Sequence, residues 1–427
     1  MKKDFLKKAS TDFALTIGAT VVLVGTLQLL VYPFLAWKLD GDRYGLFLVA
    51  IGIVNALEPS FGSTLCNTRI IRNERYEKAG IGPGDFKYLL SISAPVLAVA
   101  TAIVCWQLLS MDLLMALAVG ILTGMSIVKA YCLVAFRLHF NSKKLLLVNL
   151  LTALGYVVGM GVAFASGFWP FVFILGEAFA LACFARCSNV FSEPYGKTRL
   201  FGSSLRTYVS LIASNLITYS SVYVDRLLLY PALGPSAVST YYVATFFGKT
   251  FSFFSSPISS IMLSYMSDGV VKITVRRYHL VNLFILAVGL FMYAIAFFIG
   301  PLFAMILYPT LYDQALSLMP LGNAASIFAV VNSFNMVVVL KVAPPRLQVV
   351  SSLFRLVLYA ASIAFSSWVG SLWVLCLLML ISNAVSYLFT YSVGLFYMKR
   401  SGVIIAAEML RRSRLRCCGV PRCAATR

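Results

Sequence analysis

Histidine is scarce in this chain, and no group of side chains has the spacing of a metal site. His139 and His279 lie far apart in the sequence. The C-terminal stretch RCCGVPRC has neither metal-ligand spacing nor a nearby histidine. Most of the nine cysteines lie in or beside apolar segments, which argues against a disulfide framework. We therefore expect no metal and no cofactor.

The chain also lacks any polar stretch long enough to form a soluble domain. Only 12% of its residues are charged and 60% are hydrophobic. Apolar runs of about 20 residues, the length that spans a bilayer as a helix, recur from end to end. The sequence therefore predicts an all-α polytopic membrane protein. Charged loops divide it into twelve segments: 13–36, 44–66, 87–108, 113–136, 145–166, 169–190, 208–230, 237–262, 280–300, 317–340, 347–368 and 372–397.

Acidic residues are few, 15 against 35 lysines and arginines, which gives a net charge of +20. With the N-terminus inside, nearly all of the basic residues fall in alternate loops and in the two terminal segments. This is the positive-inside pattern of a membrane protein, and it places both termini in the cytoplasm. Because the charge is spread over short loops, it does not indicate nucleic-acid binding. The basic residues outside this pattern are Lys38, Arg43, Lys129, Arg226, Lys249 and Arg355.

The tryptophans give an independent check on this topology. All of them fall at predicted outer ends of segments, where amphipathic rings prefer the headgroup level. They are Trp37, Trp106, Trp169, Trp368 and Trp373.

The two halves of the chain show a weak internal sequence similarity. VYPFLAWKLDGDRYG after the first segment resembles LYPALGPSAVSTYY after the seventh, with a Tyr-Pro ending one helix and a tyrosine near the start of the next. Such internal similarity is typical of transporters built from repeats. We expect two six-helix lobes around a central cavity, residues 1–200 and 201–398, followed by a basic cytoplasmic tail, residues 399–427.

Residues 210–267 carry charge inside apolar helices. At about 100° per residue, the polar side chains of each helix fall within one narrow stripe. The first stripe is Ser214, Thr218, Ser221 and Asp225; the second is Tyr242, Thr245, Lys249, Ser252 and Ser256. Charges in a bilayer normally face a bundle interior or a water-filled cavity. The alternative is a helix pair joined by hydroxyls, with Asp225 and Arg226 reaching outward from the helix end.

Three other charged residues within segments have two interpretations each. Glu58, before Pro59, is either a neutral acid bonded to a neighbouring helix or a group lining the pathway. The proline should remove a helical hydrogen bond and turn Glu58 away from α geometry. Lys129 and Arg355 lie about two turns from the cytoplasmic ends of their helices, so they either snorkel to the interface or face the cavity.

The seventh and eighth segments also resemble a known family. The stretches YVDRLLLYPALG and VSTYYVATFFGKTFSFFSSPISSIMLSYMS are similar to the polysaccharide-exporter and O-antigen flippase branch of the multidrug/oligosaccharidyl-lipid/polysaccharide superfamily. A basic lead, a segment ending in Tyr-Pro and then RYGLF look like the same branch. Length and segment number extend the resemblance over nearly the whole chain, but its motifs cover only residues 25–70 and 215–266.

This resemblance implies a flippase of the bacterial inner membrane that works by alternating access. The implied cargo is a polyprenyl-diphosphate-linked oligosaccharide, moved from the cytoplasmic to the periplasmic leaflet. Such a cargo needs cations for its diphosphate and hydroxyls for its sugars. Lys249 is the first candidate for the diphosphate, and Glu58 and Asp225 are candidates for coupling to H⁺ or Na⁺. All candidates for the cavity, which should be of mixed charge, are Lys249, Arg226, Asp225, Glu58, Lys129, Arg355, Thr218, Ser221, Thr245 and Ser252.

Two other functions compete with the flippase. An efflux antiporter for small cations would share the architecture but would use acidic groups in place of Lys249. A membrane-embedded polymerase or glycosyltransferase would need catalytic groups outside the membrane. The longest external stretch, residues 300–317, has Asp313 as its only acid, so general acid/base chemistry has little to use there. We therefore expect that the protein is not an enzyme. Its expected partners are a lipid-linked oligosaccharide, membrane lipids, and a polysaccharide polymerase or glycosyltransferases.

Overall fold

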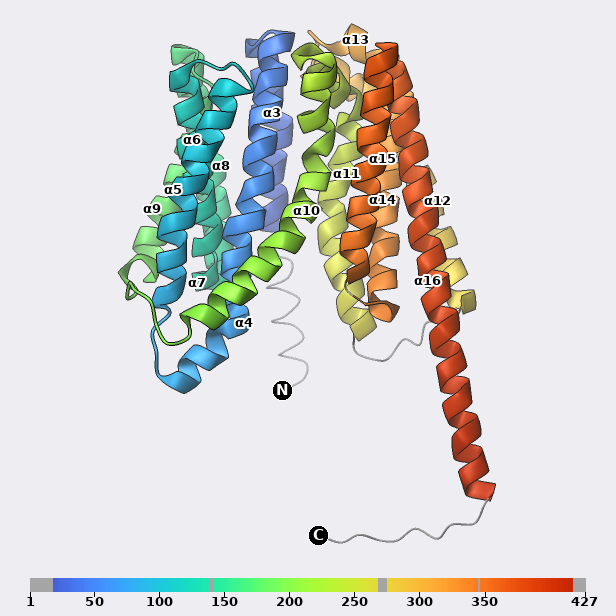
Figure 1. The fold of residues 1–427 in the computed structure, drawn as a ribbon. Helices are drawn as coiled ribbons and strands as arrows, with labels where there is room; N and C mark the ends of the chain where they lie inside the picture. The colour runs from blue at the N-terminus through green and yellow to red at the C-terminus, as the bar shows by residue number, and fades with distance from the viewer. Residues whose placement is uncertain (1–17, 139–140, 268–274, 345, 418–427) are drawn as a thin grey trace.

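The computed structural model describes residues 18–138, 141–267, 275–344 and 346–417, and every element within them is helical (Figure 1). For residues 253–267, 341, 342, 346 and 400–417 it describes the backbone alone. The start of the first predicted segment, residues 13–17, and the cysteines at 418 and 423 lie outside the described residues.

The helices are as follows. The first half contains η1 (Leu27–Val31), α2 (Tyr32–Lys38), α3 (Gly41–Leu57), η2 (Glu58–Ser63), α4 (Thr64–Ala79), α5 (Gly84–Gln107), α6 (Leu113–Cys132), α7 (Val134–Arg137), α8 (Ser142–Ser166), α9 (Pro170–Cys187) and η3 (Val190–Ser192). The second half contains α10 (Phe201–Leu233), α11 (Pro235–Ser267), α12 (Val275–Leu307), α13 (Tyr312–Leu316), α14 (Met319–Val342), α15 (Arg346–Val369) and α16 (Leu372–Cys417).

Ten helical stretches of the described chain are long and apolar enough to cross a membrane. The first is Gly18–Lys38, which runs through η1 and α2, and the second is Gly41–Ala79, which runs through η2 into α4. The helices α10 and α11, of 33 residues each, run beside these ten and complete the predicted set (Figure 1). The prediction of an all-α, multi-pass membrane protein is confirmed.

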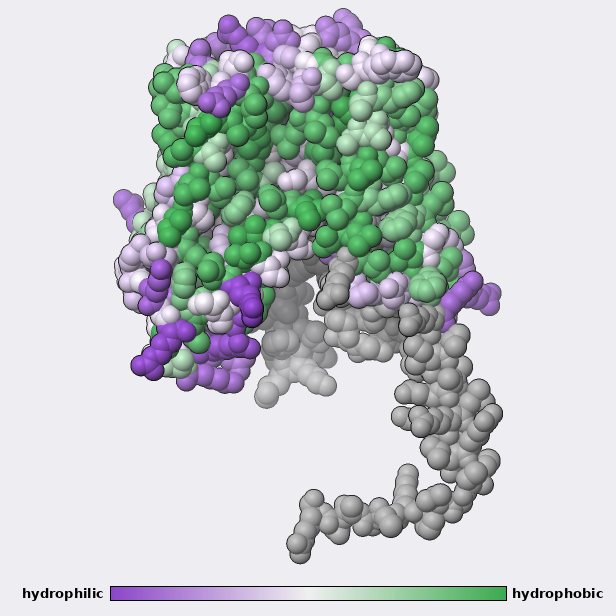
Figure 2. All heavy atoms as spheres, in the orientation of Figure 1, coloured by the Kyte–Doolittle hydropathy of each residue, from purple (hydrophilic) through white to green (hydrophobic). Residues whose placement is uncertain are grey.

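The helices form two groups. α5, α6, α8 and α9 pack on one another in the first, and α11, α12, α14, α15 and α16 pack on one another in the second. Between them, α3 and α10 contact each other, and α10 also packs along α15 (Figure 1). On the face shown in Figure 2, a broad apolar belt covers the body, with hydrophilic residues at its upper and lower edges. This is the surface that a bilayer requires.

We call the lower edge in Figure 1, where α4 ends, the basic side, and the upper edge the opposite side. On the basic side, the loop between α9 and α10 is tied to the first group. Arg69 of α4 donates two hydrogen bonds to Glu193, and the buried Asp85 accepts bonds from the amide and hydroxyl of Thr198 and from Tyr76. The connection between the two halves is therefore fixed to α4 and α5.

The opposite side is closed by close packing of α3 on α11. A Cβ atom at Gly45 would overlap the backbone of Pro235. Tyr44 and Tyr32 make edge-to-face contacts with Tyr242 at ring distances of 6.1 and 5.9 Å. Aromatic rings of α2, α3 and α11 thus form a packed layer on this side.

Two details differ from the sequence predictions. Trp169 is buried against Phe47 at a ring distance of 5.0 Å, while the other four tryptophans are at least half exposed. Glu58 keeps right-handed helical dihedral angles (φ −50°, ψ −58°), and the effect of Pro59 is absorbed by the wider π turn of η2. The expected departure of Glu58 from α geometry is therefore wrong, because a π turn removes the clash without breaking the helix.

Candidate functional site

A cavity of about 550 Å³ lies between the second group of helices and the helices α2, α3 and α10. Residues of η1, α2, α3, α10, α11, α14, α15 and α16 line it. α14 contributes small side chains at successive turns, and these leave the space that larger residues would fill. They are Ala325, Ser326, Ala329 and Ser333.

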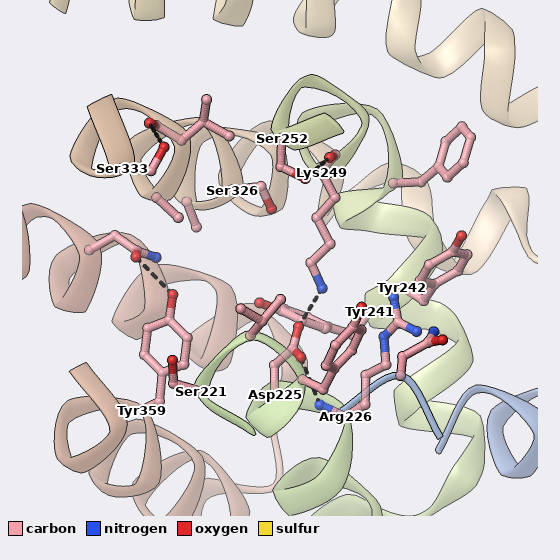
Figure 3. A pocket seen from close by; sticks show the side chains of 18 of the residues that line it. Ser221, Asp225, Arg226, Tyr241, Tyr242, Lys249, Ser252, Ser326, Ser333 and Tyr359 are labelled. Carbon is pink, nitrogen blue, oxygen red and sulfur yellow. Dashed lines mark hydrogen bonds and ion pairs between the residues drawn. The ribbon is translucent and has the colours of Figure 1, made fainter. Parts of the chain in front are cut away.

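Asp225 and Lys249 form an ion pair across this cavity (Figure 3). Asp225 extends from α10 and Lys249 from α11, and both belong to the predicted polar stripes. The same carboxylate accepts a hydrogen bond of 2.9 Å from the backbone amide of Arg226. The ion pair therefore fixes the position of α10 along α11, which apolar contacts alone would not fix.

Arg226 lies in the cavity wall with its guanidinium stacked on tyrosines. Its Cζ atom is 4.8 Å from the ring centre of Tyr242 and 5.8 Å from that of Tyr223. The residue is 7% exposed, and its Nε and Nη1 atoms have no hydrogen-bond partner among the described residues. A buried guanidinium with unused donors beside an open space suits an anionic ligand.

Arg355 extends from α15 into the cavity. It bonds to Ser221, which lies one turn closer to the basic side than Asp225 on α10. The Nη2 of Arg355 donates a hydrogen bond of 2.9 Å to the Ser221 hydroxyl, and its Nε has no partner among the described residues. Tyr359, one turn further along α15, donates a bond of 2.7 Å to Asn383 of α16. The cavity thus combines charge with hydroxyl and amide groups.

The side chains that line this cavity include three cations and one carboxylate. The cations are Lys249, Arg226 and Arg355, and the carboxylate is Asp225. Glu58, expected here from the sequence, is not among the lining residues. The cavity therefore carries an excess of positive charge, in contrast to the mixed cavity that the sequence suggested.

The predicted site residues separate into two sets. Six of the ten candidates line the cavity: Lys249, Arg226, Asp225, Arg355, Ser221 and Ser252. The other four, Glu58, Lys129, Thr218 and Thr245, do not.

Thr218 and Thr245 belong to the predicted stripes but bond within their own helices. Thr218 donates to the carbonyl of Ser214 at 3.0 Å. The fully buried Thr245 donates to the carbonyl of Tyr241 at 2.9 Å and lies in a close contact between α11 and α14 near Gly322. Neither hydroxyl lines the cavity, so placing them there was wrong: Thr245 is covered by α14, and the hydroxyl of Thr218 is bonded to its own helix.

Lys129 forms an ion pair with Glu177 inside the first group of helices. The Nζ–Oε1 distance is 2.6 Å, and the hydroxyl of Tyr156 lies 3.4 Å from the same oxygen. Glu58 interacts electrostatically with both partners of this pair. Lys129 therefore neither reaches the interface nor lines the cavity, and both predictions for it are wrong. The reason is Glu177, an acid two helices along the chain that sequence spacing could not orient.

Sequence reasoning missed several polar residues that line the cavity. Tyr242 donates a hydrogen bond of 2.8 Å to Gln28, which joins α11 to η1. The missed residues are Gln28, Asn55, Tyr223, Ser326, Ser333, Tyr359 and Asn383. The amides among them stand alone in apolar segments, which is itself a signal that such positions face the interior.

With this geometry in hand, the chain can be compared with known proteins. No model of a known protein family and no curated protein matches the sequence. Several solved structures match its shape. One is the inward-facing conformation of a multidrug resistance MATE family transporter of the MOP superfamily, at a TM-score of 0.68 and 13% identity, over 91% of this chain and 94% of that one.

This chain has the MATE fold. An outward-facing structure of a multidrug resistance MATE transporter aligns at a TM-score of 0.61 and 11% identity, over 91% of this chain and 96% of that one. A MATE in complex with MaL6 aligns at 0.64 and 11%, over the same shares. The MATE fold is thus shared along almost the entire length of both chains.

Proposed function

We propose that the chain transports an anionic, lipid-linked oligosaccharide across the bacterial inner membrane. The cargo is a polyprenyl-diphosphate-linked repeat unit of O-antigen, capsule or exopolysaccharide, which moves from the cytoplasmic to the periplasmic leaflet. The observation that carries this proposal is the excess of positive charge in the cavity, with donors of Arg226 and Arg355 unused. The fold, shared with transporters of the MOP superfamily, supports transport in general.

The chemistry of the cavity suits such a cargo. Guanidinium groups bind phosphate oxygens through paired, charge-assisted hydrogen bonds, and they remain charged at any cellular pH. Serine, tyrosine and asparagine side chains on α14, α15 and α16 offer partners for sugar hydroxyls. A volume of about 550 Å³ lies within the roughly 300–1,000 Å³ of small-molecule sites, enough for a headgroup while a lipid tail stays in the bilayer.

The direction of transport follows from the orientation in the membrane. By the positive-inside rule, the basic side faces the cytoplasm. The packing of Gly45 on Pro235 and the tyrosine layer lie on the opposite side, and from this we infer that the cavity loads from the cytoplasm. We expect the protein to act without catalysis, between a glycosyltransferase that supplies the lipid-linked unit and a polymerase that uses it.

Ion coupling is a further part of this proposal. Glu58 interacts electrostatically with both members of the Lys129–Glu177 pair and is not among the residues that line the cavity. The Oε2 atom of Glu177 has no partner among the described residues. Asp225 is in the cavity itself. A proton or Na⁺ bound at Glu58 would act on the first group of helices, and one bound at Asp225 would compete with Lys249.

The second candidate is an efflux antiporter for small molecules. The observation in its favour is the fold, since the solved structures of similar shape include multidrug resistance transporters. A cationic drug would need to bind Asp225, which already pairs with Lys249 in a cavity lined by two further basic side chains. We therefore place the anionic cargo first.

The deciding experiment follows lipid-linked oligosaccharide in cells that lack the protein. Sugars are labelled from outside in intact spheroplasts and again after lysis. We expect complete lipid-linked oligosaccharide to accumulate on the cytoplasmic side. Wild-type protein should relieve this accumulation, whereas Arg226→Gln and Arg355→Gln, expressed at equal levels, should not.

Lys78→Gln is the matched control, since Lys78 is an exposed lysine on α4 that pairs only with Glu74. Accumulation of lipid-linked oligosaccharide already exposed on the outside would contradict the flippase proposal. Unchanged oligosaccharide together with increased sensitivity to cationic drugs would move the antiporter to first place.

A further inference from the structure

Asp225 occupies the position in the cavity where an oxygen of an anionic ligand would bind. Its Oδ2 accepts from the Lys249 ammonium and its Oδ1 accepts from the Arg226 amide. Figure 3 shows the carboxylate bonded to the Lys249 ammonium on one side and to the backbone amide of Arg226 on the other. The residue is 5% exposed and is the only acid among the lining residues. It therefore acts on Lys249 as a bound anion would.

This arrangement satisfies one cation and leaves another partly unused. Lys249 has its carboxylate, whereas the guanidinium of Arg226 is held over Tyr242 by ring contact and has two nitrogens without partners among the described residues. A ligand with several anionic oxygens can bond both groups at once, which a single carboxylate on a helix does not do. A diphosphate has the charge and the number of oxygens for this.

We propose that Asp225 is an internal counter-ion, which holds Lys249 while the cavity is empty and is displaced from it by the phosphate groups of the cargo. This inference rests on the proposed function and adds a regulatory role for one residue of the site. No covalent step is involved. Asp225 and the cargo compete for the same ammonium group, so the strength of cargo binding is the difference between two interactions.

Displacement has a structural effect as well. The Asp225–Lys249 pair joins α10 to α11, and Arg226 contacts Tyr242 in the layer that closes the opposite side. When the cargo draws Lys249 and Arg226 toward itself, both the α10–α11 tie and the support of Tyr242 are weakened. Release of the cargo restores the pair, which keeps an empty carrier closed on this side.

Inorganic pyrophosphate tests this competition directly. Its binding to detergent-solubilised, full-length protein is measured by titration calorimetry for wild type, Asp225→Asn, Lys249→Gln and the double variant. Asp225→Asn is expected to bind pyrophosphate at least tenfold more tightly than wild type. In the Lys249→Gln background, the same Asp225→Asn change should give at most a threefold gain, because no ammonium remains to be released.

Two results would overturn the counter-ion. One is binding by Asp225→Asn that equals wild type or is weaker. The other is an equal gain with and without Lys249, which would mean that Asp225 acts only through its overall negative potential. If wild type binds pyrophosphate and Arg226→Gln does not, the anion site of the proposed function stands whichever of these two results is found.

Failure of the proposed function gives a different pattern. There, neither wild type nor any Asp225 variant binds pyrophosphate, and the counter-ion fails with it. Each variant is first checked for elution and thermal unfolding like those of wild type. Should Asp225→Asn not fold, Asp225→Ser supplies a smaller neutral side chain that is expected to show the same gain.

Discussion

The Lys129–Glu177 pair is the most deeply buried ion pair in the first group of helices. Removing one partner of such a pair leaves an uncompensated charge in a medium of low dielectric constant, which costs about 3–5 kcal/mol. We therefore expect Lys129→Ala to lower the stability of the protein by several kcal/mol, measured as a fall in the thermal unfolding temperature in detergent.

The matched control is Lys78→Ala, which breaks a pair with Glu74 whose side chains are 75% and 76% exposed. An exposed pair one helical turn apart contributes at most about 0.5 kcal/mol. Equal unfolding temperatures for the two variants would contradict the structural role of Lys129.

At the same scale, helical spacing explains how much of the site was predictable. Ser221 and Asp225 are four residues apart, and both do face the cavity. Thr245 has the same relation to Lys249, yet it is covered by α14. Spacing gives the face of a helix, but which part of that face stays open depends on neighbours that come from distant parts of the chain. Whether the lining residues bind cargo remains a prediction.

Among the elements, the helices themselves were the easiest part to predict, since each apolar run has a length set by the bilayer. Their extensions were not predictable in this way. α10 begins at Phe201, well before the predicted start at 208, because its first turns pack on α4 outside the apolar belt. The π turns η1 and η2 also escaped prediction. At Pro59 the sequence predicted a departure from α geometry, and at the Tyr-Pro of Pro33 it predicted a helix end.

The contact between α3 and α11 gives a prediction for one glycine. Gly45→Ala places a Cβ against the backbone of Pro235, so the opposite side should no longer close. We expect at least a tenfold loss of transport. A cysteine at Ala329, in a background without other cysteines, should become reactive toward an impermeant thiol reagent added outside.

Gly52→Ala is the control on the same helix. Its added Cβ would lie 3.9 Å from Cδ of Arg226, an ordinary van der Waals contact, so closure should persist. Equal thiol reactivity in Gly45→Ala and Gly52→Ala would argue against this contact as the closing element.

For the whole molecule, the charge distribution predicts the orientation. In a background without other cysteines, a cysteine in place of Lys78 on α4 should react with an impermeant reagent only after lysis. One in place of Asp313 on α13 should react in intact spheroplasts. The reverse pattern would invert the direction assigned to transport.

The two similar segments of the sequence contact each other in the folded molecule. Tyr32 and Tyr44 belong to the first of these similar segments, and Tyr242 belongs to the second. Their rings are in contact on the opposite side. Gly45 and Pro235 also belong to these two segments. The sequence indicated two related segments, but nothing in their one-dimensional pattern said that they would pack against each other.

The pairing of Asp225 with Lys249 also bears on how the chain enters the membrane during synthesis. Apart from the ten apolar stretches, α10 and α11 are the long helices of the described chain, and only Gly234 separates them. Each alone would carry buried charge into lipid at about 2.5–3.5 kcal/mol per charged side chain. Inserted together as a hairpin, they neutralise the charges of Asp225 and Lys249 and leave only Arg226 without a counter-charge. The translocation machinery should therefore integrate them as one unit rather than one after the other.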